Sequence, residues 1–215
     1  MAEIVRTEEW QVDGRLLELD LSVAILRQVG EAALRARESC SPLHPPTYPG
    51  TAAWGASVLT LRTLALPRGF RAADPGNFSM TINDAKRFYI VAATGDEHSG
   101  YYSGRDPSTK TPKGLKTQQA VHRQFALWPD ADAETMAREG GVEGYLGMWL
   151  LLNFRHREVH IELSAPSEIR RGKIVDWHER NIVPSVTFDP EASSHDAPGG
   201  DGFGPDFDIP VQRIA

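Results

Sequence analysis

Cysteine is nearly absent from this sequence, since Cys40 is its only one. A lone cysteine cannot form an intramolecular disulfide, and a zinc site built on cysteine ligands is excluded. The first residues, MAEIVRTEEW, lack the basic and apolar regions of a secretory signal. No apolar run approaches the roughly 20 residues that cross a bilayer. We therefore expect a protein of the reducing cytoplasm without membrane attachment.

Positive charge is also scarce. The 215 residues include 23 Lys and Arg against 29 Asp and Glu, a formal net charge of −6. This balance argues against a protein that coats nucleic acid, because such proteins direct a strong positive field at the phosphate backbone. The composition is otherwise that of a globular protein and predicts one domain over residues 1–188, a flexible linker over 189–205 and a docking peptide over 206–215.

Several enzyme motifs are missing. The sequence has no G-x-S-x-G nucleophile elbow and no Glu-x-Lys pair of a nuclease core. Gly95 and Gly100 have the glycine spacing of a phosphate-binding P-loop, but Tyr101 and Tyr102 follow where a lysine and a hydroxyl residue are required. These absences exclude a P-loop and argue against the other two classes.

The N-terminal half combines turn and helix signals. Asp13-Gly14 is typical of a hairpin turn, and Leu17, Leu19 and Leu21 alternate like residues of a half-buried strand. Apolar residues at helical spacing then predict a helix over 21–38. The sequence therefore predicts a short hairpin followed by a long helix.

The next segment, 41–50, contains four prolines and cannot form regular structure. A second helix is expected over 51–66, with Trp54, Val58, Leu61 and Ala65 on its buried stripe. Pro67 ends it.

Strand patterns dominate the remainder. A hairpin is expected around the turn 83–86, and Gly140-Gly141 is expected to close a short helix over 130–139. Other expected elements are a helix over 115–128, a buried central strand over 144–154, a strand over 157–164, and weaker edge strands over 172–177 and 181–188. Strands in adjacent pairs separated by helices predict the α+β class, with a mixed or mainly antiparallel sheet and helices packed largely on one face.

The loop 94–117 is the main candidate site, because long loops in compact domains are usually functional or disordered. Its acidic start carries the candidate catalytic residues Asp96, Glu97 and His98, which could also hold a divalent metal or a proton. Its basic end precedes a predicted helix, a favourable place for an anion. The candidate phosphate-binding residues are Arg105, Ser108, Thr109, Lys110, Thr111, Lys113 and Lys116.

Two further polar stretches contain histidine and glutamate. In 156–162, His160 with Glu158 or Glu162 could share a metal with a third ligand, although the polar face of an edge strand explains the pattern better. The stretch 177–180, Trp-His-Glu-Arg, is interpreted as a surface or hairpin feature.

These observations leave two function classes open. The first is binding, or metal-assisted processing, of a phosphorylated ligand such as a nucleotide or a nucleic-acid end through loop 94–117. The second is a non-catalytic interaction or structural protein. It would dock a protein partner or a second copy through segment 41–50, loop 94–117 or the peptide 206–215.

Overall fold

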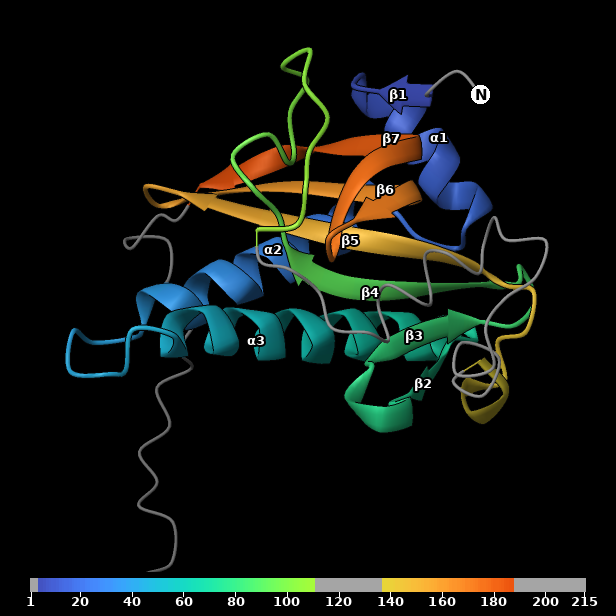
Figure 1. Cartoon of the computed structure of the whole chain (residues 1–215), viewed down its shortest axis with the longest axis horizontal. Helices are drawn as coiled ribbons and strands as arrows, with labels where there is room; N and C mark the ends of the chain where they lie inside the picture. The colour runs from blue at the N-terminus through green and yellow to red at the C-terminus, as the bar shows by residue number, and fades with distance from the viewer. Residues whose placement is uncertain (1–3, 111–136, 188–215) are drawn as a thin grey trace, which may run out of the picture.

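The computed structural model describes residues 4–110 and 137–187, and these form one seven-stranded sheet with helices against it (Figure 1). The elements in chain order are β1 (Ile4–Arg6), α1 (Glu9–Glu18), α2 (Val23–Glu38), α3 (Tyr48–Ala65), η1 (Leu66–Arg68), β2 (Arg71–Ala73), η2 (Pro75–Asn77), β3 (Met80–Asn83), β4 (Phe88–Thr94), β5 (Leu146–Arg155), β6 (Glu158–Arg170) and β7 (Lys173–Thr187).

The strand order is β1-β7-β6-β5-β4-β3-β2. Strands β1 and β7 run parallel, as do β4 and β5, and the other neighbouring pairs are antiparallel. The α+β class is therefore confirmed, with a mixed rather than mainly antiparallel sheet. No helix in the described part of the chain is long and apolar enough to cross a membrane.

The hydrophobic core has two layers, one on each face of the sheet. Helices α1, α2 and α3 bury residues such as Leu16, Val29 and Leu61 against Leu150 and Ile161 on one face (Figure 1). The second cluster lies mainly on the opposite face. It includes Met80, Ile82, Tyr89, Trp149 and Trp177.

The predicted hairpin at Asp13-Gly14 is wrong, because residues 9–18 form helix α1. Val12 and Leu16, one helical turn apart, are both fully buried, whereas Leu17 is 60% exposed. The Asp13 carboxylate accepts a hydrogen bond from the Val23 amide and so supports the start of α2 instead of a turn. Burial of residues one helical turn apart therefore decided the structure here, despite the local turn signal of Asp13-Gly14.

Helix α2 confirms the predicted helix over 21–38, with the Ser22 hydroxyl accepting from the Ile25 amide at its start. Helix α3 begins at Tyr48, three residues earlier than predicted, since Pro49 is tolerated in a first turn. Its buried stripe is Ala53, Ser57, Leu61 and Ala65, so the placement of Trp54 and Val58 on that stripe was wrong. Trp54 is 42% exposed.

The predicted hairpin of β3 and β4 is confirmed, and β5 is a buried interior strand as expected. The helix end at Gly140-Gly141 is confirmed too, with Gly141 at φ 63°. The predicted helix 115–128 and the segments 189–205 and 206–215 lie outside the described residues.

The two predicted edge strands over 172–177 and 181–188 are one continuous strand, β7. Pro184 fits inside it because the pairing with β6 is irregular there: Val183 opposes Ile161, and Val186 opposes Val159. Strand β6 was expected at an edge but lies between β5 and β7. The edges of the described sheet are instead β1 and β2.

Candidate functional site

The loop after β4 is closed at its base. Gly95 and Thr109 form an antiparallel bridge, the Asp96 amide donates to the Ser108 carbonyl over 2.8 Å, and the Lys110 amide donates to the Thr94 carbonyl over 3.1 Å. The acidic start of the loop therefore lies beside its basic end.

The tip of this loop packs on β6. Gly100 has φ +81°, and a Cβ added there would lie 2.5 Å from His160 Cβ and 2.7 Å from the Ile161 nitrogen. Only glycine allows the backbone to approach this closely. The Ser99 carbonyl accepts from Asn153 Nδ2, and the Pro107 carbonyl accepts from Trp177 Nε1. The loop is thus fastened to three neighbouring strands.

A buried ion pair holds the same loop. Arg180 Nη2 lies 2.8 Å from Glu162 Oε2, and the two side chains are 1% and 0% exposed. Glu162 Oε2 also accepts from the Gly100 amide, and Arg180 Nη2 donates to the Tyr101 carbonyl over 3.4 Å. The Ser164 hydroxyl donates to the other Glu162 oxygen. Both partners of this pair touch loop backbone.

Two sequence interpretations fail at this pair. Glu162 was assigned to a solvent-facing strand surface and Arg180 to a surface cluster, yet both are buried. The polar face of β6 and β7 is covered by loop 95–110, which a period-two pattern cannot reveal. Trp177 and Glu179 of the same cluster are also buried, at 1% and 5% exposure.

The three predicted catalytic residues do not converge. Asp96 Oδ1 accepts from the His98 amide and the Ser99 hydroxyl, so it stabilises the turn of the loop. The Glu97 side chain is 75% exposed, and its carboxylate lies 3.8 Å from His98 Nε2. His98 Nδ1 is 3.4 Å from the Ser103 hydroxyl.

A different polar cluster forms the rim of the loop. The Arg155 guanidinium lies 4.9 Å from the centre of the Tyr101 ring, and Nη2 donates to the Tyr101 hydroxyl over 2.9 Å. It also donates to the Glu97 carbonyl. The His160 ring is 5.8 Å from the Tyr101 ring, and His160 Nε2 is 3.6 Å from Glu158 Oε2. Because these residues lie far apart in the chain, sequence spacing gave no signal for the cluster.

The metal hypothesis gains little from this geometry. His160 and Glu158 are close, as predicted, but Glu162 is bound to Arg180. Within residues 4–110 and 137–187, no group of three or more His, Cys, Asp or Glu side chains could hold a metal ion.

The predicted phosphate-binding residues are only partly described. Arg105 and Lys110 are exposed, Ser108 is half-buried and Thr109 is fully buried. Among the described residues, the buried hydroxyls of Ser108 and Thr109 have no hydrogen-bond partner. Thr111, Lys113 and Lys116 lie outside the described residues.

A second ionic centre joins the N-terminal elements to the sheet. Glu179 on β7 accepts from Arg6 Nη1 of β1 over 2.9 Å and from Arg15 Nε of α1 over 2.6 Å. Burial works to raise the pKa of Glu179, but the hydrogen bond and charge of Arg15, with the charge of Arg6, hold that pKa below its ordinary value. The carboxylate is therefore kept ionised.

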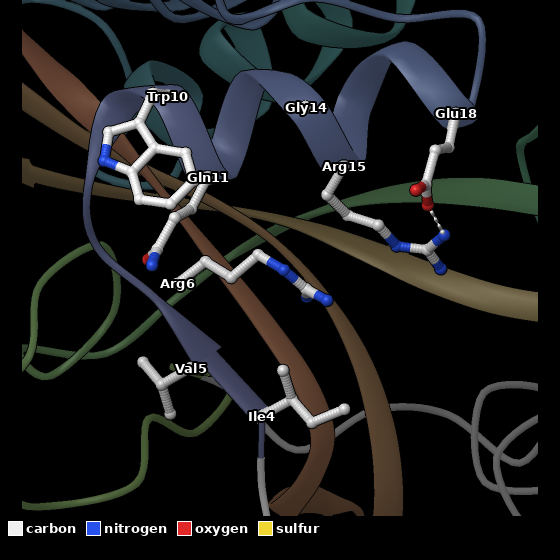
Figure 2. A pocket seen from close by; sticks show the side chains of 8 residues that line it. All are labelled: Ile4, Val5, Arg6, Trp10, Gln11, Gly14, Arg15 and Glu18. Atoms are coloured by element: carbon white, nitrogen blue, oxygen red, sulfur yellow. Dashed lines mark hydrogen bonds and ion pairs between the residues drawn. The ribbon is translucent and has the colours of Figure 1, made fainter.

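A pocket of about 480 Å³ opens between β1 and α1 (Figure 2). Ile4 and Val5 line it on the strand side, and Trp10, Gln11 and Arg15 line it on the helix side. Trp10 is 74% exposed and Ile4 is 44% exposed. Gly14 leaves the middle of this helix face bare, since a Cβ there would meet nothing within 4 Å. Arg6 and Glu18 also line it, so the pocket is an open hollow of mixed apolar and charged lining beside an edge strand.

Several of the large apolar side chains that are exposed in the described residues lie on α3 or in the segments that flank it. We call this outer surface the α3 face, and it consists of Leu43, Tyr48, Thr51, Gly55, Leu59, Thr63 and Leu66, with Trp54 at its side. Leu43 is 96% exposed, Leu59 68% and Leu66 48%. Trp54 extends the face to a hollow of about 150 Å³ that Phe78 and Trp149 also line. This face includes part of segment 41–50, one of the predicted docking segments.

Comparison of this chain with protein-family models, with curated proteins and with solved structures finds no match in any of the three.

Proposed function

We propose that this protein works by binding a protein partner through the α3 face. The observation that carries the proposal is the near absence of charge on a solvent-facing helix. Among the 18 residues of α3 the only charged one is Arg62. Its guanidinium is paired, since it donates to the Asp74 carboxylate and to the carbonyls of Ala73 and Met80, and its side chain is 20% exposed.

Helix α2 provides an internal comparison, because it lies in the same layer over the same face of the sheet (Figure 1). Its solvent-facing positions include Arg27, Arg35 and Glu38. A surface helix usually keeps such a charged outer face, and a helix that is apolar all round is normally buried. Contiguous exposed apolar surface of this kind marks an interaction site.

The expected gain in free energy is adequate for recognition. Fully burying a leucine side chain contributes roughly 1.5–3 kcal/mol, and the α3 face presents three exposed leucines beside Trp54. Part of this gain offsets the loss of translational and rotational freedom.

Site-specific photo-crosslinking in the producing cell tests the proposal. A photoreactive side chain placed at Leu59 should give a crosslinked product, and the same group placed at the exposed Arg35 of α2 should give none. Absence of any product at Leu59 above the Arg35 background would contradict a docking role for this face.

A second candidate function is binding, or metal-assisted processing, of a phosphorylated ligand at loop 94–117. The buried Glu162–Arg180 pair favours it, since buried ion pairs add little to stability but fix geometry. A loop held so firmly resembles the supported loops on which binding sites are built. The exposed Arg105 and Lys110 supply positive charge at its end.

The chain's five lysines allow a matched test. Replacing Lys110, Lys113 and Lys116 by alanine should weaken binding of nucleotides or short oligonucleotides and flatten its salt dependence. Replacing the exposed Lys86 and Lys173 should leave both unchanged. If no nucleotide, DNA or RNA oligomer binds the wild-type protein at low salt, this candidate is wrong.

A further inference from the structure

We infer that the partner of the α3 face is a second copy of this chain and that the two copies pair through antiparallel α3 helices. This inference rests on the proposed docking role of that face. The pattern along the helix, the charge of the molecule and the space above Gly55 each support it.

The first support is the order of large and small residues. A twofold axis passing beside Ser57 would bring each residue of one helix opposite the residue equally far on the other side of position 57. Leu59 then opposes Gly55, Leu66 opposes Tyr48, and Thr63 opposes Thr51. In the Leu59–Gly55 pairing a large side chain meets the smallest residue, and each of the three pairings occurs twice. The centre of the face is thus complementary to itself.

The second support is the room at Gly55. A Cβ added to Gly55 would meet nothing within 4 Å, so the surface there is open to an incoming side chain. Leu59 projects one turn away and is 68% exposed. In the antiparallel pair the Leu59 side chain of each copy enters the space over Gly55 of the other. Small residues at such positions let two helices approach closely.

The third support is electrostatic. Each chain carries a formal charge of −6, so two copies repel each other at long range. The α3 face contributes no carboxylate, and the Arg62 guanidinium is already bound to Asp74. Two copies that meet through this face therefore bring no like charges into direct contact. Two copies that met through the charged outer surface of α2 would instead bring like charges together.

The size of the face sets the expected strength. A helix of 18 residues is about 27 Å long and roughly 10 Å wide, so one side of it covers about 270 Å², about a third of the roughly 800 Å² per partner of a standard interface. Leu43, which precedes the helix and is 96% exposed, enlarges the contact. We therefore expect a dimer that dissociates in the micromolar range.

Analytical ultracentrifugation of the full chain and of charge variants tests the pairing. Wild-type protein should sediment as a dimer at tens of micromolar, and the variants Leu59→Lys and Gly55→Glu should each be monomeric. An equimolar mixture of the two variants should regain a dimer, because lysine then opposes glutamate once and the other contact keeps the native leucine and glycine. Leu17→Lys, at a comparably exposed position on α1, should leave the dimer intact.

The possible outcomes distinguish a failure of dimerisation from a failure of the proposed docking role of the α3 face. A mixture that stays monomeric overturns the antiparallel register, and a wild-type chain that is monomeric up to about 100 µM overturns self-association. If the wild-type chain is monomeric while the photoreactive group at Leu59 captures a different protein, the docking role stands and the second copy is wrong. If the group at Leu59 captures nothing, both are wrong.

Discussion

The carboxylate of Glu162 on β6 and the guanidinium of Arg180 on β7 meet over 2.8 Å with at most 1% of either side chain exposed. Each also bonds to the backbone of loop 95–110, Glu162 through the Gly100 amide and Arg180 through the Tyr101 carbonyl. One ion pair therefore joins two strands of the sheet to a loop that begins more than 50 residues earlier. Removing this ion pair should therefore affect both the two strands and the loop.

Arg180→Met should lower the free energy of unfolding by about 3–5 kcal/mol, because Glu162 would remain buried without its counter-charge. Chemical denaturation measures this loss. The double variant Glu162→Leu with Arg180→Met should be more stable than the single variant, since no isolated buried charge remains. A single variant that loses less than about 1 kcal/mol would show that the pair is not buried in solution.

Two glycines in the loop permit a controlled test of its close approach to β6. Gly100 and Gly104 both have positive φ, +81° and +71°, but a Cβ at Gly100 would collide with His160 whereas one at Gly104 would meet nothing within 4 Å. Gly104→Ala should therefore cost about 1 kcal/mol from backbone strain alone. Gly100→Ala should cost distinctly more, because the loop must lift from the strand.

Thermal melting and amide exchange compare the two variants. Gly100→Ala should increase exchange at the amides of Ser99 and Gly100, and Gly104→Ala should leave these amides protected. Equal destabilisation by both substitutions would contradict the close packing of the loop on β6.

Local patterns predicted much of the fold. Helix α2, the β3–β4 hairpin and the interior strand β5 follow from apolar periodicity and turn residues. The hairpin at Asp13-Gly14 failed because Val12 and Leu16 bury the helical face of the same residues. Strand β1 gave too short a signal, since within the described residues it is Ile4–Arg6 that pair with β7.

The site was harder to predict, for a physical reason. The partners Glu162 and Arg180 lie on neighbouring strands, and loop 95–110 covers them, so a polar residue that looked solvent-facing is buried. Only a pattern linking distant residues could have revealed this. By contrast, the scarcity of charge on residues 48–65, where Arg62 is the one charged residue, is visible in the sequence itself, and segment 41–50 is among the predicted docking segments.

Stability at low pH should depend on Glu179. Its folded pKa is depressed by Arg15 and Arg6 despite burial, so its contribution is present above the unfolded pKa of about 4.3 and is lost as pH falls through the folded pKa. The free energy of unfolding should therefore fall steeply from about pH 5 downward. Glu179→Gln should reduce this slope and destabilise the protein at neutral pH.

Denaturation series at several pH values measure the slope. Glu143→Gln, at an exposed position before β5, is the matched control and should leave the slope unchanged. An unchanged slope in the Glu179→Gln variant would contradict a depressed pKa for Glu179.

The peptide 206–215 should dock on the molecule, because Phe207, Ile209 and Val211 alternate with polar residues and proline like an added strand. Among the described strands, β1 is an edge with its second side unpaired, and it borders the pocket that Ile4, Val5 and Trp10 line together with charged residues (Figure 2). The chain is long enough to reach this edge. Arg6 of β1 pairs with Asn181, which lies six residues or about 20 Å along β7 from Thr187, and an extended segment 188–206 could span up to roughly 60 Å.

Deletion of 206–215 should therefore lower the melting temperature or dissociate an oligomer. A synthetic 206–215 peptide, but not a scrambled one, should restore the melting temperature or the oligomer. A truncated protein that melts and sediments like the full chain would show that the peptide does not dock.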